Sequence, residues 1–192
     1  GITNIESIDI EMANKLGYSI LLLGISKIKK NVIEYRVHPS LVSQKSIISK
    51  VKNELNTVVL DCHLADKTIL IGKGAGKNPT ASAVLSDIID STKKEKRGLV
   101  TSNKYIKNPL KVANIKDRKG KFYVRMGVMD TPGVLADITA FFKRNKISIS
   151  TMFQLEKKIS NYVQLIFVTH QIIEKQLTLS IKKIEKLDKV KT

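Results

Sequence analysis

The sequence has little of what marks an exported or membrane-spanning protein. A single cysteine, Cys62, excludes an internal disulfide and is typical of a reducing compartment. Tryptophan is absent, and no apolar run approaches the roughly 20 residues that span a membrane. The first residues, "GITNIESIDIE", show no basic segment that leads into an apolar one. We therefore expect no secretory signal, no membrane span and a cytoplasmic location.

Acidic residues are also scarce: 17 Asp and Glu stand against 34 Lys and Arg, which gives a formal net charge of +17. A charge of this size would suit a nucleic-acid partner. However, most of the positive residues are lysines, whereas base recognition favours the bidentate arginine side chain. Aromatic residues make up only 5% of the chain and are not interleaved with basic ones, so no stacking platform for bases is evident. The composition favours a solvated, lysine-rich surface over nucleic-acid binding.

Side chains that bind metals or act as nucleophiles are few and scattered. His38, His63 and His170 fall on three different predicted elements, and no cysteine or acidic cluster joins them at metal-ligand spacing. We expect no metal site. Cys62 ends a predicted strand and has no activating partner in the sequence, so we expect a buried and inert thiol.

The chain divides at a basic stretch, residues 91–121, which carries roughly half of the net charge and shows little periodicity. We predict a first domain over residues 1–92, a basic linker over 93–120 and a second domain over 121–192. A chain of 192 residues is long enough for two small domains, each with its own core.

The first part is predicted to start with a short helix, with Ser7 as its N-cap and Gly17 in the left-handed position that ends it. A further helix is predicted from Pro79 to about Ser91. Between the helices, short polar connections join strand-like runs and indicate an antiparallel sheet, since a parallel pair needs a long crossover. The strand-like runs are residues 18–26, 31–42, 56–62 and 67–73.

The second part follows the order β-α-β-β-α. Alternating apolar residues over 121–128 indicate a strand, and Thr131 followed by Pro132 is predicted to start the first helix. The chain ends where a fourth strand would start, so we predict a ferredoxin-like unit whose last strand is truncated. The fold class is α+β. The predicted core stripes of the two helices are Val134, Leu135, Ile138, Phe141 and Phe142, and Ile173, Leu177, Ile181 and Ile184.

A glycine-rich segment, "IGKGAGKNPTASAVLSDIID", ends the last strand of the first part. Gly72, Gly74 and Gly76 allow positive φ and let a ligand approach the backbone closely. Asn78 is predicted to cap the following helix, with Pro79 in its first turn. A strand, a glycine loop and a helix in this order suit an anionic ligand, because free N–H groups point out of the start of a helix.

Neither of the two common phosphate-binding fingerprints is present, however. The dinucleotide pattern Gly-x-Gly-x-x-Gly needs a third glycine where Lys77 stands. The nucleotide-binding P-loop pattern needs glycine in place of Ile71 and a hydroxyl in place of Asn78. From the residues alone, a tight turn without a ligand explains the segment as well as a binding loop does.

The segment "GKGAGKNPTASAVLSDIID" closely resembles the motif near the end of the catalytic region of homoserine dehydrogenases. The stretches "GITNI", "ANKLGYSILLLGIS", "RVHPSLV" and "NTVVLDC" match the same family in the same order. The second part, through "VMDTPGVLADITAFFKRNKISIS" and "QLIFVTH", resembles an ACT domain, a module that senses small molecules. Together the two resemblances cover essentially the whole chain.

The resemblance implies an NADH- or NADPH-dependent interconversion of aspartate semialdehyde and homoserine, on the path to threonine and methionine. The Rossmann half and the catalytic lysine of such enzymes have no counterpart in this sequence, so it implies the carboxyl-terminal part of the enzyme, inactive alone and with no catalytic residue of its own. A homo-oligomer, dimer or tetramer, is expected. The alternative is a stand-alone regulatory protein that binds an amino acid through its ACT domain and catalyses nothing.

For the cofactor, the resemblance implies that the backbone of Gly74, Ala75 and Gly76 contacts the nicotinamide end of NAD or NADP, with Gly76 the first choice. Lys77 stands where the family usually has a small or apolar residue, and either points to water or pairs with a phosphate.

For the regulatory ligand, the resemblance implies a site in the loop that precedes the first helix of the ACT domain. Asp130 would bind the ammonium group of an amino acid, and Gly133, Val134 and Leu135 would bring the start of the helix close to its carboxylate. Residues 147–149 on the neighbouring strand would complete the pocket. Threonine, an end product of the pathway, is the expected effector. From the residues alone, capping of its own turn explains Asp130 equally well.

Overall fold

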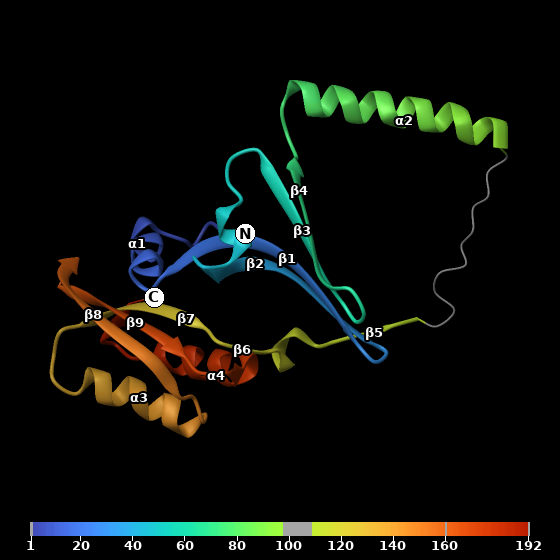
Figure 1. Ribbon diagram of the computed structural model, residues 1–192. Helices are drawn as coiled ribbons and strands as arrows, with labels where there is room; N and C mark the ends of the chain where they lie inside the picture. Colours follow the sequence, from blue (N-terminus) through green and yellow to red (C-terminus); the bar gives the residue numbers. More distant parts are fainter. Residues whose placement is uncertain (1, 98–108, 160, 192) are drawn as a thin grey trace. The chain divides into compact units, whose positions relative to one another are not determined.

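The computed structural model describes residues 2–97, 109–159 and 161–191, and only the backbone of residues 94–97 and 156–159. Two compact units make up the chain. Unit 1 comprises Gly1–Leu23 and Val37–Pro109, and unit 2 comprises Gly24–Arg36 and Leu110–Thr192. Each unit is described by itself below, with the elements labelled in Figure 1.

Unit 1 begins with helix α1, Ser7–Lys15. The predicted N-cap at Ser7 is wrong by one residue: Glu6 is the N-cap, and its backbone N–H donates to the Asp9 carboxylate at 2.9 Å. Gly17 has a φ of 77°, which confirms the left-handed residue predicted after the helix. The helix therefore ends before Gly17 as predicted, although its N-cap is Glu6 and not Ser7.

Strands β1, Tyr18–Lys29, and β2, Val32–Ser43, form a long hairpin around a two-residue turn with Lys30 at a φ of 55°. A short strand from far along the chain, β5, Lys111–Val112, pairs with β2 in parallel. The N–H of Lys111 donates to the carbonyl of Asn31 at 2.9 Å, and the N–H of Ala113 to that of Ile33 at 2.8 Å. The sequence predicted only antiparallel pairing in this region, and the parallel pair is a correction to it.

Strands β3, Leu55–Cys62, and β4, Asp66–Lys73, form a second antiparallel hairpin in register from Leu55↔Lys73 to Cys62↔Asp66. A short 3₁₀ helix, η1, Ile47–Lys50, precedes it. In the part of the chain that the structure describes, the two hairpins belong to separate sheets, so the predicted strands do not form one sheet. Cys62 is exposed, and the expectation of a buried thiol is wrong.

Helix α2, Lys77–Arg97, follows β4 and is longer at both ends than the predicted helix. Its apolar side chains have no cover among the described residues, since each keeps more than two-fifths of its surface exposed. These side chains are Val84, Leu85, Ile88 and Ile89.

Unit 2 contains an antiparallel sheet with the strand order β11-β7-β9-β8. This order, with two helices in the connections, is that of a ferredoxin-like fold, and it confirms the predicted class. The fourth strand is short, and its two residues pair with Val128 and Gly127 of β7. The elements are β7, Tyr123–Met129; α3, Val134–Arg144; β8, Ile149–Ile159; β9, Tyr162–Thr169; α4, Glu174–Ile184; and β11, Val190–Lys191.

One face of this sheet and both helices share a single apolar core. Alternate residues of β7 and β9 point into it, as the period of a strand requires, and Phe142 of α3 meets Phe167 of β9 edge to face at 5.3 Å between ring centroids. Leu135 is the exception in the predicted stripe of α3, because it is exposed. The core consists of Met126, Val128, Val134, Ile138, Phe142, Ile147, Val163, Leu165, Phe167, Ile172 and Ile184.

The end of α3 is closed by a Schellman motif. Ile147 N–H donates to the carbonyl of Phe142 at 2.9 Å, and Lys146 N–H donates to that of Lys143 at 3.0 Å. Lys146 is left-handed at a φ of 56°, a position that glycine usually occupies. The motif turns the chain so that Ile147 enters the core directly after the helix.

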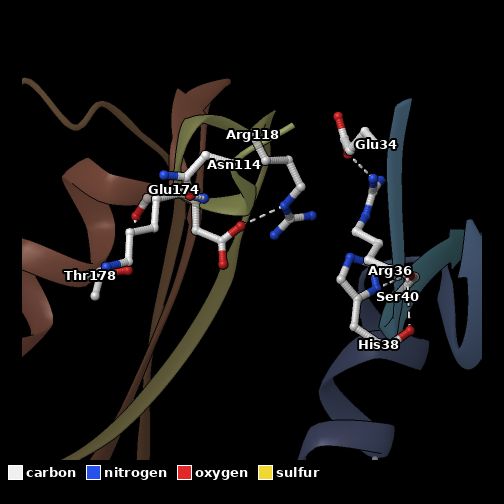
Figure 2. Close-up of polar contacts among 9 residues, drawn as sticks. Glu34, Arg36, His38, Ser40, Asn114, Arg118, Glu174 and Thr178 are labelled. Atoms are coloured by element: carbon white, nitrogen blue, oxygen red, sulfur yellow. Dashed lines mark hydrogen bonds and ion pairs between the residues drawn. The ribbon is translucent and has the colours of Figure 1, made fainter. Parts of the chain in front are cut away.

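A lead-in segment, residues 110–121, is fastened to the start of α4. It contains η2, Ile115–Asp117, and β6, Lys119–Gly120, and β6 pairs with β10, Ile172–Ile173. Figure 2 shows the ion pair that completes this attachment, from Arg118 Nε to Glu174 Oε2 at 2.7 Å. The Arg118 guanidinium also lies over the Phe122 ring, 4.7 Å from its centroid.

Candidate functional site

The glycine loop joins β4 to α2 at one end of the β3–β4 hairpin (Figure 1). Residues 71–78 are all exposed, so the backbone of the loop is accessible rather than sealed under side chains. Gly76 has a φ of +113°, a conformation that strains any residue with a Cβ. Only the Pro79 ring, at 3.6 Å, would come close to such a Cβ. The loop thus presents a bare, left-handed glycine at its tip.

Helix α2 starts earlier than the sequence predicts, directly after Gly76, whose carbonyl accepts the first helical hydrogen bond from Thr80 N–H at 3.1 Å. Asn78 is the second helical residue, so its predicted role as N-cap is wrong. Pro79 lies in the first turn as expected. Because proline has no N–H, that turn offers a ligand the N–H groups of Lys77 and Asn78.

The base of the loop is held by the start of the neighbouring strand. Gly74 N–H donates to the Glu54 carbonyl at 2.8 Å, and Lys73 Nζ lies 3.2 Å from Glu54 Oε1. A hydrogen bond from its own backbone N–H, and secondly the one from Lys73, lower the pKa of the Glu54 carboxyl below its ordinary value. Glu54 therefore stays charged and partly neutralises the lysine beside the loop.

Of the three glycines, Gly74 is the one that a side chain approaches most closely. A Cβ on Gly74 would lie only 1.7 Å from Asn56 Nδ2, whereas a Cβ on Gly72 would meet nothing within 4 Å. Sequence reasoning missed Asn56 and Glu54. No local signal marks them, because their proximity to the loop arises from the β3–β4 register.

The second predicted site, in the loop between β7 and α3, is also exposed over residues 130–133. Asp130 Oδ1 accepts a hydrogen bond from Gln154 Nε2 on β8 at 3.4 Å. Gly133 has a φ of +91°, and a Cβ there would meet nothing within 4 Å. The acidic side chain and the bare glycine predicted for this site are thus accessible on one loop.

Helix α3 starts at Val134 with Gly133 as its N-cap, so the predicted start at Thr131 and Pro132 is wrong. Val134 is a core residue, and its side chain is buried away from the loop surface. Its N–H donates a long hydrogen bond to the Thr131 carbonyl at 3.4 Å, which the carboxylate of a ligand would have to replace. Leu135 keeps an exposed side chain next to the loop.

The histidines do not come together. Within the described ranges no three His, Cys, Asp or Glu side chains are grouped so that they could hold a metal ion. His38 lies on β2, where its Nδ1 is 3.0 Å from the Ser40 hydroxyl (Figure 2). No described helix has the length and apolar content needed to cross a membrane.

Comparison with known families assigns each part of the chain. Residues 1–89 match the family model for homoserine dehydrogenase, and residues 122–189 match that for the ACT domain. The glycine loop and both hairpins lie in the first match, and the ferredoxin-like unit accounts for the second. Residues 1–89 belong to the homoserine dehydrogenase family, and residues 122–189 form an ACT domain.

Relatives from several bacteria align with almost the whole chain. A homoserine dehydrogenase of Helicobacter pylori is 37% identical over 190 residues, which are 99% of this chain and 45% of that protein. One of Neisseria gonorrhoeae is 31% identical over 98% of this chain and 45% of its own length. The chain therefore spans a little less than half the length of these homoserine dehydrogenases.

Solved structures give the same result. The crystal structure of a homoserine dehydrogenase from Thiobacillus denitrificans superposes with a TM-score of 0.82 and is 33% identical; the match covers 100% of this chain and 44% of that one. The Staphylococcus aureus homoserine dehydrogenase, at 21% identity and a TM-score of 0.59, is similar in fold alone.

Proposed function

We propose that this chain is the carboxyl-terminal part of an NAD(P)-dependent homoserine dehydrogenase, which interconverts L-homoserine and L-aspartate 4-semialdehyde in threonine and methionine biosynthesis. The observation that carries the proposal is the accessible glycine loop, with left-handed Gly76 at its tip, in the segment that matches the family. The bound dinucleotide supplies the hydride acceptor. The residues of this chain bind and orient its nicotinamide end through the backbone of Gly74, Ala75 and Gly76.

The exposed apolar side chains of unit 1 support a role as one part of a larger enzyme. Val58 on β3 and Leu70 on β4 keep more than half of their surface exposed, as do Val84, Leu85 and Ile88 on α2. Groups of exposed apolar side chains, such as those on this hairpin and on this helix, are normally covered by another protein surface. We infer that the remainder of the enzyme, or a second subunit of a homo-oligomer, covers it in the cytoplasm.

The test uses the complete enzyme with Gly76→Val. A β-branched residue at a φ of +113° stores strain of about 1–3 kcal/mol or displaces the loop, so we expect the KM for the dinucleotide to rise by about 10-fold or more. Gly72→Ala is the matched control, because Gly72 has an ordinary φ and open space for a Cβ. An unchanged KM in Gly76→Val would contradict the cofactor assignment. The chain alone should show no reduction of aspartate semialdehyde.

For the ACT domain we propose that the loop of residues 130–133 binds an amino-acid effector, with threonine as the expected ligand. Asp130 would pair with the ammonium group, and the N–H groups of Val134 and Leu135 would face the carboxylate. Calorimetric titration of threonine into the folded chain should give a saturable signal that Asp130→Asn weakens about 10-fold, since a charge-assisted hydrogen bond contributes about 1.5–3 kcal/mol. Threonine binding by the chain, together with a complete protein that does not oxidise homoserine, would favour the stand-alone regulatory protein.

A further inference from the structure

The Asn56 side chain lies very close to Gly74. Asn56 faces Gly72 across the hairpin, and Gly74 follows two residues later, directly after the end of β4. A Cβ on Gly74 would lie 1.7 Å from Asn56 Nδ2 and 2.5 Å from Cγ, distances that no side chain tolerates. A side chain at position 74 would therefore force the Asn56 amide to move.

The contact with Gly74 orients the Asn56 amide but leaves its hydrogen-bonding groups available to a ligand. Its Nδ2 is the atom nearest to Gly74, while Oδ1 lies farther out, at 3.2 Å from the same Cβ position. The residue is exposed, and none of the hydrogen bonds found among the described side chains involves its amide. The next residue differs, because the Thr57 hydroxyl donates to the Leu70 carbonyl at 3.0 Å. An amide offers two donors and an acceptor, so Asn56 can still bind a polar partner at the edge of the loop.

We propose that Asn56 recognises the carboxamide of the nicotinamide ring, with its Oδ1 accepting a hydrogen bond from the carboxamide N–H₂. This inference rests on the proposed function, which brings the nicotinamide to the backbone beside Gly74. In this position beside Gly74, Asn56 has two roles. It packs on Gly74 and so fixes the loop, and it selects a pyridine ring that carries an amide over one that carries another substituent.

The first experiment compares two cofactors in the complete enzyme. In 3-acetylpyridine adenine dinucleotide a methyl group replaces the carboxamide NH₂, so the proposed hydrogen bond cannot form. With Asn56→Ala we expect the Kd of the natural dinucleotide, measured by calorimetry without substrate, and its KM in homoserine oxidation both to rise about 5-fold, the value of one net hydrogen bond. The KM for the acetylpyridine analogue should change less than about 2-fold, because that cofactor has no such bond to lose.

Thr68→Ala is the control for this comparison, since Thr68 is an exposed polar residue of the same hairpin, at its opposite end from the loop. It should leave both KM values unchanged. An equal rise for both cofactors in Asn56→Ala, or no rise for either, overturns the recognition of the carboxamide. Neither result affects the proposed function, which fails only if the unmodified enzyme does not oxidise homoserine or if Gly76→Val leaves the KM unchanged.

A second experiment tests the contact itself. Gly74→Ala should displace the Asn56 amide and so reproduce the cofactor-selective rise in KM of Asn56→Ala, without unfolding the loop, because the φ of Gly74 is one that alanine can adopt. In the Asn56→Ala background, Gly74→Ala should add less than about a 2-fold further effect, since groups in contact are not additive. Independent, additive losses from the two substitutions would contradict the proposed coupling.

Discussion

The two units of the chain differ in how they bury their apolar residues. Among the described residues, the fully buried apolar side chains of unit 1 are Met12 and Ala13, both on α1, whereas unit 2 buries a continuous core between its sheet and two helices. Strands β3 and β4 are as rich in Val, Leu and Ile as the strands of unit 2, yet all of these residues except Ile69 are exposed. Apolar content alone therefore does not make a core.

The difference follows from how far the helices and sheets of each unit cover one another's apolar faces. In unit 2, both helices return to the same face of a four-stranded sheet, and every apolar stripe meets another one. In unit 1, the β3–β4 hairpin is a two-stranded sheet, which is only marginally stable without a surface to pack on. The ACT domain thus buries its apolar residues against its own elements, while the glycine loop stands on elements that need a partner surface.

The largest expected effect on the free energy of unfolding is that of a substitution in the core of unit 2. Phe142→Ala removes a fully buried ring and its edge-to-face contact with Phe167, so it should lower the free energy of unfolding by about 3–5 kcal/mol. Val58→Ala, at a half-exposed position on β3, should lower it by less than about 0.5 kcal/mol in the chain alone. Urea unfolding followed by circular dichroism measures both.

The stability effects of the same two substitutions can be compared between the complete enzyme and the chain alone. If another surface covers β3, the effect of Val58→Ala should grow to about 1 kcal/mol, because removal of buried methyl groups then loses transfer free energy. The effect of Phe142→Ala should stay the same. Equal effects of Val58→Ala in both contexts would mean that β3 has no partner surface.

A smaller effect is expected at the attachment of the lead-in segment. Arg118→Met removes the cation from Glu174, and both side chains of this pair are largely shielded from solvent. We expect a loss of about 1–2 kcal/mol, between the values of an exposed pair and a buried one. The double variant Arg118→Met/Glu174→Gln should recover part of it, because no uncompensated charge remains. Thermal unfolding of the chain measures the series.

A stabilising change is expected at the end of α3. Lys146→Gly relieves the left-handed conformation of Lys146 in the Schellman motif, and should raise the free energy of unfolding by about 0.5–1 kcal/mol. The neighbouring control, Lys143→Gly, puts glycine into the last turn of the helix and should lower it by about 0.5–1 kcal/mol. A loss of stability in both variants would mean that the Lys146 side chain, not its backbone, matters.

The smallest effect concerns the base of the glycine loop. The pKa of Glu54 is lowered in the folded chain, so its charged form stabilises this conformation above the pKa of the unfolded chain, and the stabilisation is lost as the pH falls through the lowered value. Lys73→Met should return the Glu54 pKa only part of the way, since the backbone hydrogen bond is the larger cause. An NMR titration of the Glu54 carboxyl reports it directly; no upward shift would contradict the role of Lys73.

Features with a strong local signal could be predicted from the sequence. The alternation over residues 122–128 specifies which face of β7 enters the core, and Gly17 and Gly76 adopt the positive φ that only glycine takes easily. Helix starts were less predictable. Residues that commonly cap helices stand at Ser7, Thr131 and Asn78, but the backbone places the caps one residue or two away from them, at Glu6, Gly133 and Gly76.

Features that depend on distant pairing could not be predicted. β5 is two residues long and lies in a lysine-rich stretch, so no pattern reveals that it pairs in parallel with β2. The exposure of Cys62 follows from the uncovered hairpin that it ends, which hydrophobicity does not report. In the same way, the sequence marks Gly74 as special but not why, because Asn56 reaches it only through the register of β3 and β4.

The attachment of residues 110–121 bears on how the ACT domain can be prepared by recombinant expression. A fragment that begins at Lys121 would leave the Glu174 carboxylate without Arg118, the N–H of Glu174 without its carbonyl acceptor and Ile172 without its partner on β6. All three losses fall on the first turn of α4 or directly before it. A fragment that begins at Leu110 retains these contacts and is therefore the better starting point for expression of this domain.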